Sequence, residues 1–333
     1  MSQGKSRFPH LLTLVAIAAF ALWCIYALRA DLSRVSLGPV VRAWPLALFA
    51  VLLSLLNYLL RIGRWRWYLR RLGHRVAFRF AALTYLAGFS FTLSPGKVGE
   101  MARARYYVEV GIPLPDVAAA FCVERLMDLL AMLALAALML GALPHYRSAL
   151  WVAAVIVGAA LLVLIATPWK GLAELAGRLG AARGTSHRSR ACHWIGRLLG
   201  GLVGMLAAAR ALQRPQVLLL GFAIALAAWG CEGIGLFSLA SMFPAVPLAP
   251  TVAIGVYAVA VLIGALSFLP GGLGSTEAML TTLLVSQGFP VPQAFLITMV
   301  CRIVTLWLAV CLGWAAIAIL RQRSITAELP SWR

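Results

Sequence analysis

The chain has 333 residues, of which 62% are hydrophobic and only 12% are charged. These proportions exclude an ordinary soluble domain and a disordered chain. Lys and Arg outnumber Asp and Glu by 29 to 10, which gives a formal net charge of +19. Because the basic residues flank apolar runs, membrane topology explains this excess better than binding to nucleic acid does. The composition therefore predicts an all-α polytopic membrane protein.

Six apolar segments are predicted to cross the membrane fully, which takes about 20 residues of helix. They are residues 11–28, 44–60, 117–143, 149–167, 217–243 and 292–320. The first follows Lys5 and Arg7 and resembles a signal peptide. Its apolar run is longer than a typical signal, and no clean small-x-small cleavage site follows it, which favours an uncleaved anchor. Residues 1–43 are thus expected to hold this anchor and a short outer loop.

Four basic segments predict the orientation of the chain. They are the N-terminus with Lys5 and Arg7, residues 61–79 with seven arginines, residues 170–214, and the tail 321–333 with Arg321 and Arg323. The positive-inside rule places all four in the cytoplasm. Both termini are therefore expected in the cytoplasm, with the protein in a bacterial inner membrane. Residues 144–214 would form a connecting span and a basic cytoplasmic loop.

Residues 61–80 allow two interpretations. Five apolar residues fall on one helical stripe, and most of the arginines fall elsewhere; the stripe is Trp65, Leu69, Leu72, Val76 and Phe80. Such a helix would lie on the anionic lipids of the inner leaflet, with Arg61–Arg79 as the contact. A plain cytoplasmic loop fits the sequence equally well.

Two further apolar segments are interrupted by Pro-Gly motifs. Residues 81–93 would rise only about 20 Å as a helix, against a hydrocarbon core of about 30 Å. A hairpin that enters from the cytoplasm and turns at "SPGKVGE" explains this short run. The second comprises residues 251–269, the break "PGGLG" and residues 276–286, and would enter from outside. Two full crossings remain an alternative for this second hairpin.

The two hairpins suggest an internal repeat. Both breaks contain Leu, then Pro-Gly, then Gly and Glu, in "LSPGKVGE" and "LPGGLGSTE". Three landmark pairs recur at offsets of 170, 175 and 177 positions: Pro45 with Pro215, Pro95 with Pro270, and Arg125 with Arg302. Residues 44–143 and 215–320 would then be repeats that run in opposite directions. Inverted repeats with broken helices are typical of transporters, whose site lies where the breaks meet.

The breaks predict an anion site. Ser94 would cap a helix that begins at Pro95, and Ser275 one that begins at Thr276, so that both half-helices point free N–H groups at the centre. Glycines would let a headgroup approach the backbone, and basic side chains would supply positive charge. The expected substrate-binding residues are Ser94, Gly96, Lys97, Gly99, Arg125, Gly271, Gly272, Gly274, Ser275 and Arg302.

Acidic residues within apolar segments form a second group of candidates. They are Glu100, Glu124, Asp128, Glu232 and Glu277, and either proton coupling or a structural role fits them. Glu124, Arg125 and Asp128 could form a structural ion cluster, because Arg125 reaches Asp128 at i,i+3. Arg302 could pair with Glu277 or with Glu232, which otherwise stands alone in its segment.

Cysteines and histidines give no sign of a metal centre. The six cysteines contain no C-x-x-C pair, and the five histidines show no ligand spacing. His187 and His193 lie in a basic segment, where solvated side chains are expected. The sequence therefore predicts no metal site, no disulfide and no cofactor.

The motifs "SPGKVGEMARARY", "ERLMD" and "LPGGLGSTEAMLTTLL" resemble the lysylphosphatidylglycerol synthase transmembrane-region family of flippase-like proteins. The resemblance covers roughly residues 10–320. In the best-known members of the family this domain moves lysyl-phosphatidylglycerol between leaflets, and a separate soluble domain makes the lipid. The positions that match the family pattern are Pro95, Gly96, Gly99, Glu100, Glu124, Arg125, Pro270, Gly271, Gly274 and Glu277.

The sequence and the resemblance together favour lipid translocation. Since the chain ends at Arg333, soon after the last span, the aminoacyl-transfer domain is expected to be absent. Two alternatives remain: an integral-membrane lipid-modifying enzyme, and a scaffold that partners a biosynthetic enzyme of a hopanoid or isoprenoid-linked pathway. The sequence contains no Ser-His pair, metal triad or aspartate-rich diphosphate motif, which makes an enzyme the weaker expectation.

Overall fold

The computed structural model describes residues 38–139, 187–267 and 269–325, with residues 148, 151, 155 and 158. Within these ranges the chain is helical and contains no strand. The first group of helices is α2 (Gly38–Arg42), α3 (Trp44–Arg71), α4 (Phe78–Phe89), η1 (Pro95–Arg103), α5 (Ala104–Glu109) and α6 (Leu114–Ala137). The second group is α9 (His187–Leu212), α10 (Pro215–Ala240), α11 (Pro250–Leu266), η3 (Pro270–Gly272), α12 (Ser275–Ser286), α13 (Val291–Arg302), η4 (Ile303–Trp307) and α14 (Leu308–Ile325).

Three continuous helices are long and apolar enough to cross a membrane. They are Trp44–Arg71, Pro215–Ala240 and Val291–Gln322, which agree with the spans predicted at 44–60, 217–243 and 292–320. All three begin with proline in the first turn, where its missing N–H costs no helical hydrogen bond. The expectation of an all-α membrane protein is thus confirmed. The predicted spans 11–28 and 149–167 lie outside the described residues.

Helix α6 corresponds to the predicted span 117–143 and has 24 residues, but it carries Glu124, Arg125 and Asp128 in its middle. Charged side chains in such a helix face protein or water rather than lipid. Glu124 is fully buried, and Asp128 is 5% exposed. The charged face of α6 therefore points into the bundle.

Both Pro-Gly breaks interrupt short helices, as predicted. Helix α4 has 12 residues, which rise about 18 Å, less than the hydrocarbon core of about 30 Å. Helix α11 has 17 residues and packs against the 12-residue α12 on the far side of its break. The two breaks lie against each other, since η1 packs on η3. A Cβ added to Gly271 would lie 2.8 Å from Leu93 Cδ2.

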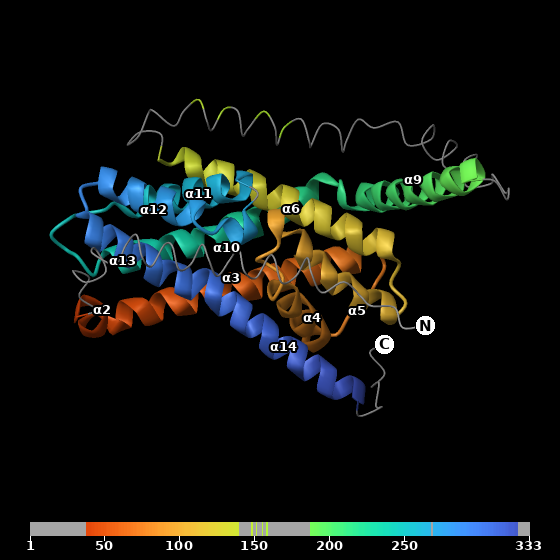
Figure 1. The fold of residues 1–333 in the computed structure, drawn as a ribbon, viewed down its shortest axis with the longest axis horizontal. Coiled ribbons are helices and arrows are strands. Elements are labelled where there is room, and N and C mark those ends of the chain that lie inside the picture. Colours follow the sequence, from red (N-terminus) through yellow and green to blue (C-terminus); the bar gives the residue numbers. More distant parts are fainter. Residues whose placement is uncertain are drawn as a thin grey trace.

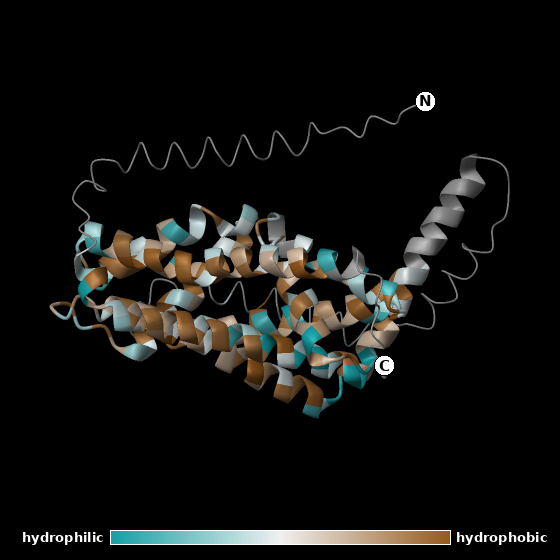
Figure 2. Ribbon diagram, turned by 90° about the horizontal axis from the view of Figure 1, so that it is seen from below, coloured by the Kyte–Doolittle hydropathy of each residue, from teal (hydrophilic) through white to brown (hydrophobic). Residues whose placement is uncertain are grey.

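The bundle is organised around the α3–α10 pair, which run side by side in Figure 1. Helix α4 packs on α14, while α6 packs on α9, α10 and α11. Figure 2 shows that most of the long helices are dominated by hydrophobic residues. Hydrophilic residues gather toward the half that contains the C-terminal part of α3 and helix α4.

The expected interfacial helix or loop over residues 61–80 is wrong for its first half. Helix α3 continues without a break to Arg71, so residues 61–71 extend the span. Arg64 and Trp65 are fully buried, and Arg61 is 5% exposed. A turn with Gly73 at φ 93° follows, and α4 begins at Phe78. Arg70, Arg71, Arg75 and Arg79 are exposed, and Arg66 is partly buried.

The expected basic loop over residues 170–214 is also wrong in its C-terminal part. Residues 187–212 form α9, which packs on α6. Ala209 and Leu212 of this helix are buried in the core. The basic segment therefore ends in a structural helix rather than in a loop; its residues 170–186 lie outside the described ranges.

We expect Gly233→Ala to destabilise the contact between α10 and α11. A Cβ at Gly233 would lie 2.7 Å from Ile254 Cα, a backbone atom that cannot turn aside. Gly230 lies on the same helix with no atom within 4 Å of its added Cβ. Gly230→Ala is therefore the matched control, and it should be neutral or gain up to about 1 kcal/mol of helix propensity. Thermal unfolding in detergent, followed by size-exclusion of the surviving protein, measures both.

A melting temperature for Gly233→Ala equal to or above that of Gly230→Ala would contradict the tight helix contact described here.

Candidate functional site

A buried ion cluster lies where α3, η1 and α6 meet. It consists of four arginines and three acids: Arg61, Arg64, Arg103, Arg125, Glu100, Glu124 and Asp128. Its two closest ion pairs are Arg64 Nη2 to Asp128 Oδ1 and Arg103 Nη2 to Glu124 Oε2, each at 2.5 Å. The structural ion cluster that the spacing of Glu124, Arg125 and Asp128 allowed is confirmed, and it is larger than expected.

Glu124 is the most heavily bonded acid of the cluster. One oxygen accepts a short hydrogen bond from the Tyr85 hydroxyl, and Arg64 lies 3.5 Å from that same oxygen. Its other oxygen binds Arg103, whose guanidinium lies 3.7 Å from the centre of the Trp65 ring. These charge-assisted bonds and the stacking offset the cost of removing the charges from water.

Arg61 is held much more loosely than Arg64 or Arg103. Its Nη2 lies 4.0 Å from both Glu100 Oε2 and Asp128 Oδ2, and neither Nε nor Nη2 has a hydrogen-bond partner among the described residues. Its guanidinium lies instead near the rings of Phe89 and Trp229, at 5.1 and 5.3 Å from their centres. A buried guanidinium with unused donors is uncommon, because each such donor carries a desolvation cost.

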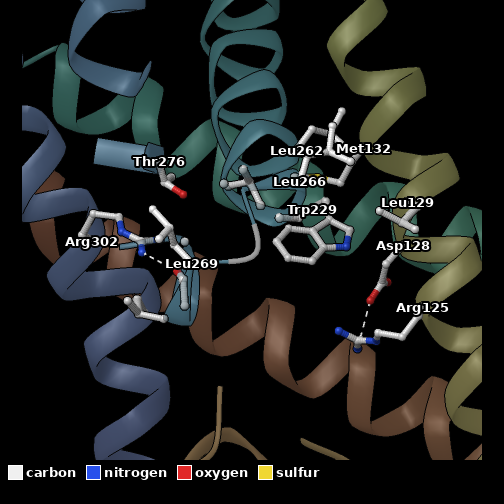
Figure 3. A pocket seen from close by; sticks show the side chains of 16 residues that line it. Arg125, Asp128, Leu129, Met132, Trp229, Leu262, Leu266, Leu269, Thr276 and Arg302 are labelled. Atoms are coloured by element: carbon white, nitrogen blue, oxygen red, sulfur yellow. Dashed lines mark hydrogen bonds and ion pairs between the residues drawn. The ribbon is translucent and has the colours of Figure 1, made fainter. Parts of the chain in front are cut away.

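A cavity of about 320 Å³ begins at this cluster. Arg125 and Asp128 lie at one side of it and Arg302 at the other, with Trp229 between them (Figure 3). The second break contributes Gly271 and Gly272. The remaining wall is mostly apolar and is formed by Leu129, Met132, Val261, Leu262, Gly264, Ala265, Leu266, Leu269, Thr276 and Leu306.

Arg302 is tied to the second break. Its Nε donates to Glu277 Oε1 at 2.6 Å, and its Nη2 donates to the Gly271 carbonyl at 3.0 Å. Glu277 in turn accepts from the Gly274 N–H at 2.7 Å. Of the two partners considered for Arg302, Glu277 is therefore the observed one. Glu232 is not alone, since it accepts a 2.9 Å hydrogen bond from Ser54 on α3.

The capping expectations are partly wrong. Ser94 does precede a helix that begins at Pro95, but this helix is 3-10, and the Ser94 hydroxyl accepts from the more distant Gly99 N–H at 2.6 Å. Helix α12 begins at Ser275 itself, with Gly274 before it at φ 83°. Ser275 bonds Ser267 and the Gly272 carbonyl instead, which closes the hairpin locally.

Of the predicted substrate-binding residues, the cavity brings together Arg125, Gly271, Gly272 and Arg302. Gly274, Ser275, Ser94 and Gly99 are not part of its wall in the structure as described. Gly99 is instead needed for packing, because an added Cβ would lie 2.8 Å from the Phe91 carbonyl oxygen. The structure does not describe the side-chain surroundings of residues 95–98, which include Gly96 and Lys97.

The sequence interpretation missed Arg61, Arg64, Arg103, Tyr85 and Trp229. Arg61 and Arg64 were counted with the cytoplasmic arginines, although no proline interrupts the sequence between Pro45 and Arg71. Their spacing of three residues on a continuing helix was the available signal. No group of three His, Cys, Asp or Glu in the described ranges could hold a metal ion. The acids of the cluster are engaged by arginine.

The fold and the cluster define an integral membrane protein of helical hairpins around a partly charged internal cavity. Residues 11–313 match the family described as "Lysylphosphatidylglycerol synthase TM region", and the chain belongs to this family. It is also 33% identical over 117 residues to a "UPF0104 membrane protein" of Methanothermobacter thermautotrophicus. That match covers 35% of this chain and 35% of the relative.

We expect Glu124→Gln to destabilise the fold strongly. The substitution leaves Arg103 buried without its charged partner, and breaking a buried pair in this way costs about 3–5 kcal/mol. Glu109→Gln is the matched control, because Glu109 pairs with Arg105 on the surface, where such pairs contribute about 1 kcal/mol or less. Thermal unfolding in detergent compares the two. Equal stability of the two variants would show that the cluster does not hold α3, η1 and α6 together.

Proposed function

We propose that this protein moves a lipid with a polar or phosphate-bearing headgroup between the leaflets of a bacterial inner membrane. The observation that carries this proposal is the cavity between Arg125 and Arg302, which joins guanidinium groups to a largely apolar wall within a membrane protein. Charges at such depth are costly and commonly mark the path of a polar substrate. A lipid supplies the matching parts, since it has an ionic headgroup joined to an apolar body.

The proposed architecture has six full spans and two opposed hairpins in inverted repeats. It is supported by helix contacts that correspond between the halves: α3 packs on α10, α4 on α14, and α11 on α6. In the proposed repeat, α4 of the first half corresponds to α11 of the second, and α6 corresponds to α14. The α4–α14 contact is therefore the counterpart of the α11–α6 contact. The contact between η1 and η3 supports a meeting of the two breaks at the centre.

In this proposal the two sides of the cavity have different roles. The headgroup passes Gly271 and Gly272, which line the cavity without adding a side chain to it. The acyl chains remain along the apolar wall and the surrounding lipid. The acids Glu100, Glu124, Asp128 and Glu277 act as partners of arginine, so they hold the site rather than carry the substrate.

Anionic lipids of the inner leaflet are proposed as partners of the turn between α3 and α4. Arg70, Arg71, Arg75 and Arg79 are exposed there, unlike Arg61 and Arg64. A cluster of exposed basic residues is attracted to anionic headgroups by about 1 kcal/mol per charge. This contact would also keep the turn and both termini on the cytoplasmic side.

Purified protein in vesicles should accelerate the exchange of headgroup-bearing lipids between leaflets, measured by quenching of a fluorescent acyl label from outside. Ala265→Trp should slow exchange at least tenfold, because Ala265 lines the cavity and the indole side chain would occupy part of its volume. Ala223→Trp is the matched control on the exposed surface of α10 and should exchange lipid like the wild type. Size-exclusion profiles verify that both variants are folded.

Absence of protein-dependent exchange for every phospholipid and polyprenyl-phosphate lipid tested would refute the proposal. Equal exchange by Ala265→Trp and the wild type would place the path outside the cavity.

A further inference from the structure

The turn between α3 and α4 bears a surface hollow whose lining, as far as the structure describes it, is Arg70, Gly73 and Arg75. This lining shares no residue with that of the cavity beside the ion cluster. We infer that Arg70 and Arg75 form a site for one phosphomonoester group, carried by a lipid of the inner leaflet or by a soluble compound. For a lipid ligand, the site rests on the contact with anionic lipids proposed above for this turn, and it assigns that contact to two of the exposed arginines.

Arg70 and Arg75 differ from the neighbouring arginines in having guanidinium groups that no protein group engages in the described part of the chain. Arg66 donates through Nε to a backbone carbonyl of the turn at 2.7 Å. The guanidinium of Arg71 lies 5.3 Å from the centre of the Trp67 ring, on which it stacks. Both arginines of the hollow therefore keep all of their side-chain donors for a ligand.

The turn that presents these two arginines has a fixed backbone. Helix α3 ends in a Schellman motif, in which the Gly73 N–H donates to the Arg70 carbonyl at 3.1 Å and the His74 N–H donates to the Leu69 carbonyl at 2.9 Å. The motif needs the φ of 93° that Gly73 has. The His74 ring lies 2.6 Å from Asp116 Oδ2, which joins the turn to α6 and engages the acid. A ligand therefore meets an ordered backbone, and binding costs less conformational entropy.

The charge and the donor geometry of the hollow set the class of ligand. Each guanidinium keeps its charge and presents a planar fork of N–H donors that matches phosphate oxygens. A phosphomonoester has three terminal oxygens and a charge of about −1.5 to −2 near pH 7. It can therefore accept from both forks and neutralise both arginines. A phosphodiester has a single negative charge and leaves part of the positive charge uncompensated, so the hollow favours a terminal phosphate.

Calorimetric titration of the full chain in an uncharged detergent tests this site with short-chain lipids. Phosphatidic acid, a phosphomonoester, should bind about fivefold more tightly than phosphatidylglycerol with the same acyl chains, because it forms more charge-assisted hydrogen bonds. Arg70→Gln and Arg75→Gln should each weaken the binding of phosphatidic acid at least about tenfold, since each removes one charged fork. Both side chains are exposed, so the variants should fold, and size-exclusion profiles verify this.

Arg79→Gln is the matched control. Arg79 is an exposed arginine in the first turn of α4, and its substitution removes the same charge, but Arg79 does not line the hollow. At physiological salt its variant should bind phosphatidic acid within about twofold of the wild type, because exposed charges beyond about 8 Å are largely screened. Equal losses for Arg79→Gln and Arg70→Gln would show a general attraction by basic charge. They would refute the defined site and leave the proposed contact with anionic lipids standing.

Inorganic phosphate, titrated against the wild type and Arg70→Gln, identifies the source of the phosphate. Binding that Arg70→Gln abolishes, at an affinity close to that of phosphatidic acid, assigns the site to a soluble phosphate compound. Binding of phosphatidic acid alone assigns it to a lipid headgroup. Equal affinities for phosphatidic acid and phosphatidylglycerol would refute a phosphomonoester site. No binding of any of these probes would refute both the site and the proposed lipid contact of the turn, whereas the proposed translocation is measured separately by lipid exchange.

Discussion

The structure depends on one constraint: the charged side chains of α3, η1 and α6 are buried in an apolar bundle and must therefore pair with one another. Isolated charges at such depth are far more costly than paired ones. Arg64 reaches Asp128 and Arg103 reaches Glu124 across different elements, and Tyr85 of α4 adds a hydrogen bond to the same acid. The cluster thereby fixes how the first hairpin sits against two of the long helices.

The second break is held by different physics. Gly271, Gly272 and Gly274 all have positive φ, a region that residues with a Cβ rarely adopt. This local path lets the Gly271 carbonyl and the Gly274 N–H turn toward the Arg302–Glu277 pair. Just after Arg302, the π-helix η4 frees the Thr305 carbonyl, which accepts from Tyr58 at 2.6 Å. The pair is thus anchored to α3 as well.

Much of the fold could be predicted because its signals are local. The prolines that begin α3 and α10, and the Pro-Gly motifs of both breaks, restrict the backbone wherever they occur. Because few acids lie within the apolar segments, only Glu277 and Glu232 were considered as partners of Arg302. The sequence could not decide between them, since the choice depends on how α12 and α13 face each other.

The cluster was predicted only in part, because a local count of charges cannot identify partners that are distant in the sequence. Residues 61–79 have seven arginines, and a rule based on loop charge counts them all as cytoplasmic. Whether Arg61 and Arg64 extend the span depends on partners about 60 residues further along the chain, on α6. Such partners become visible only when the helices are packed. The end of α9 was missed similarly, because its apolar face is defined by contact with α6.

The two sides of the cavity differ in how many of their arginine donors have hydrogen-bond partners. At Arg302 two nitrogens donate to the protein, and Glu277 balances the charge. On the side of the cluster, all four arginines keep at least one buried nitrogen without a hydrogen-bond partner among the described residues. In the proposed translocation a headgroup in the cavity would be attracted by the arginines of the cluster, and the acids that already pair with these arginines would weaken that attraction. Weak binding of the headgroup would suit the proposed lipid exchange, because a site that satisfied every donor with substrate would release it slowly.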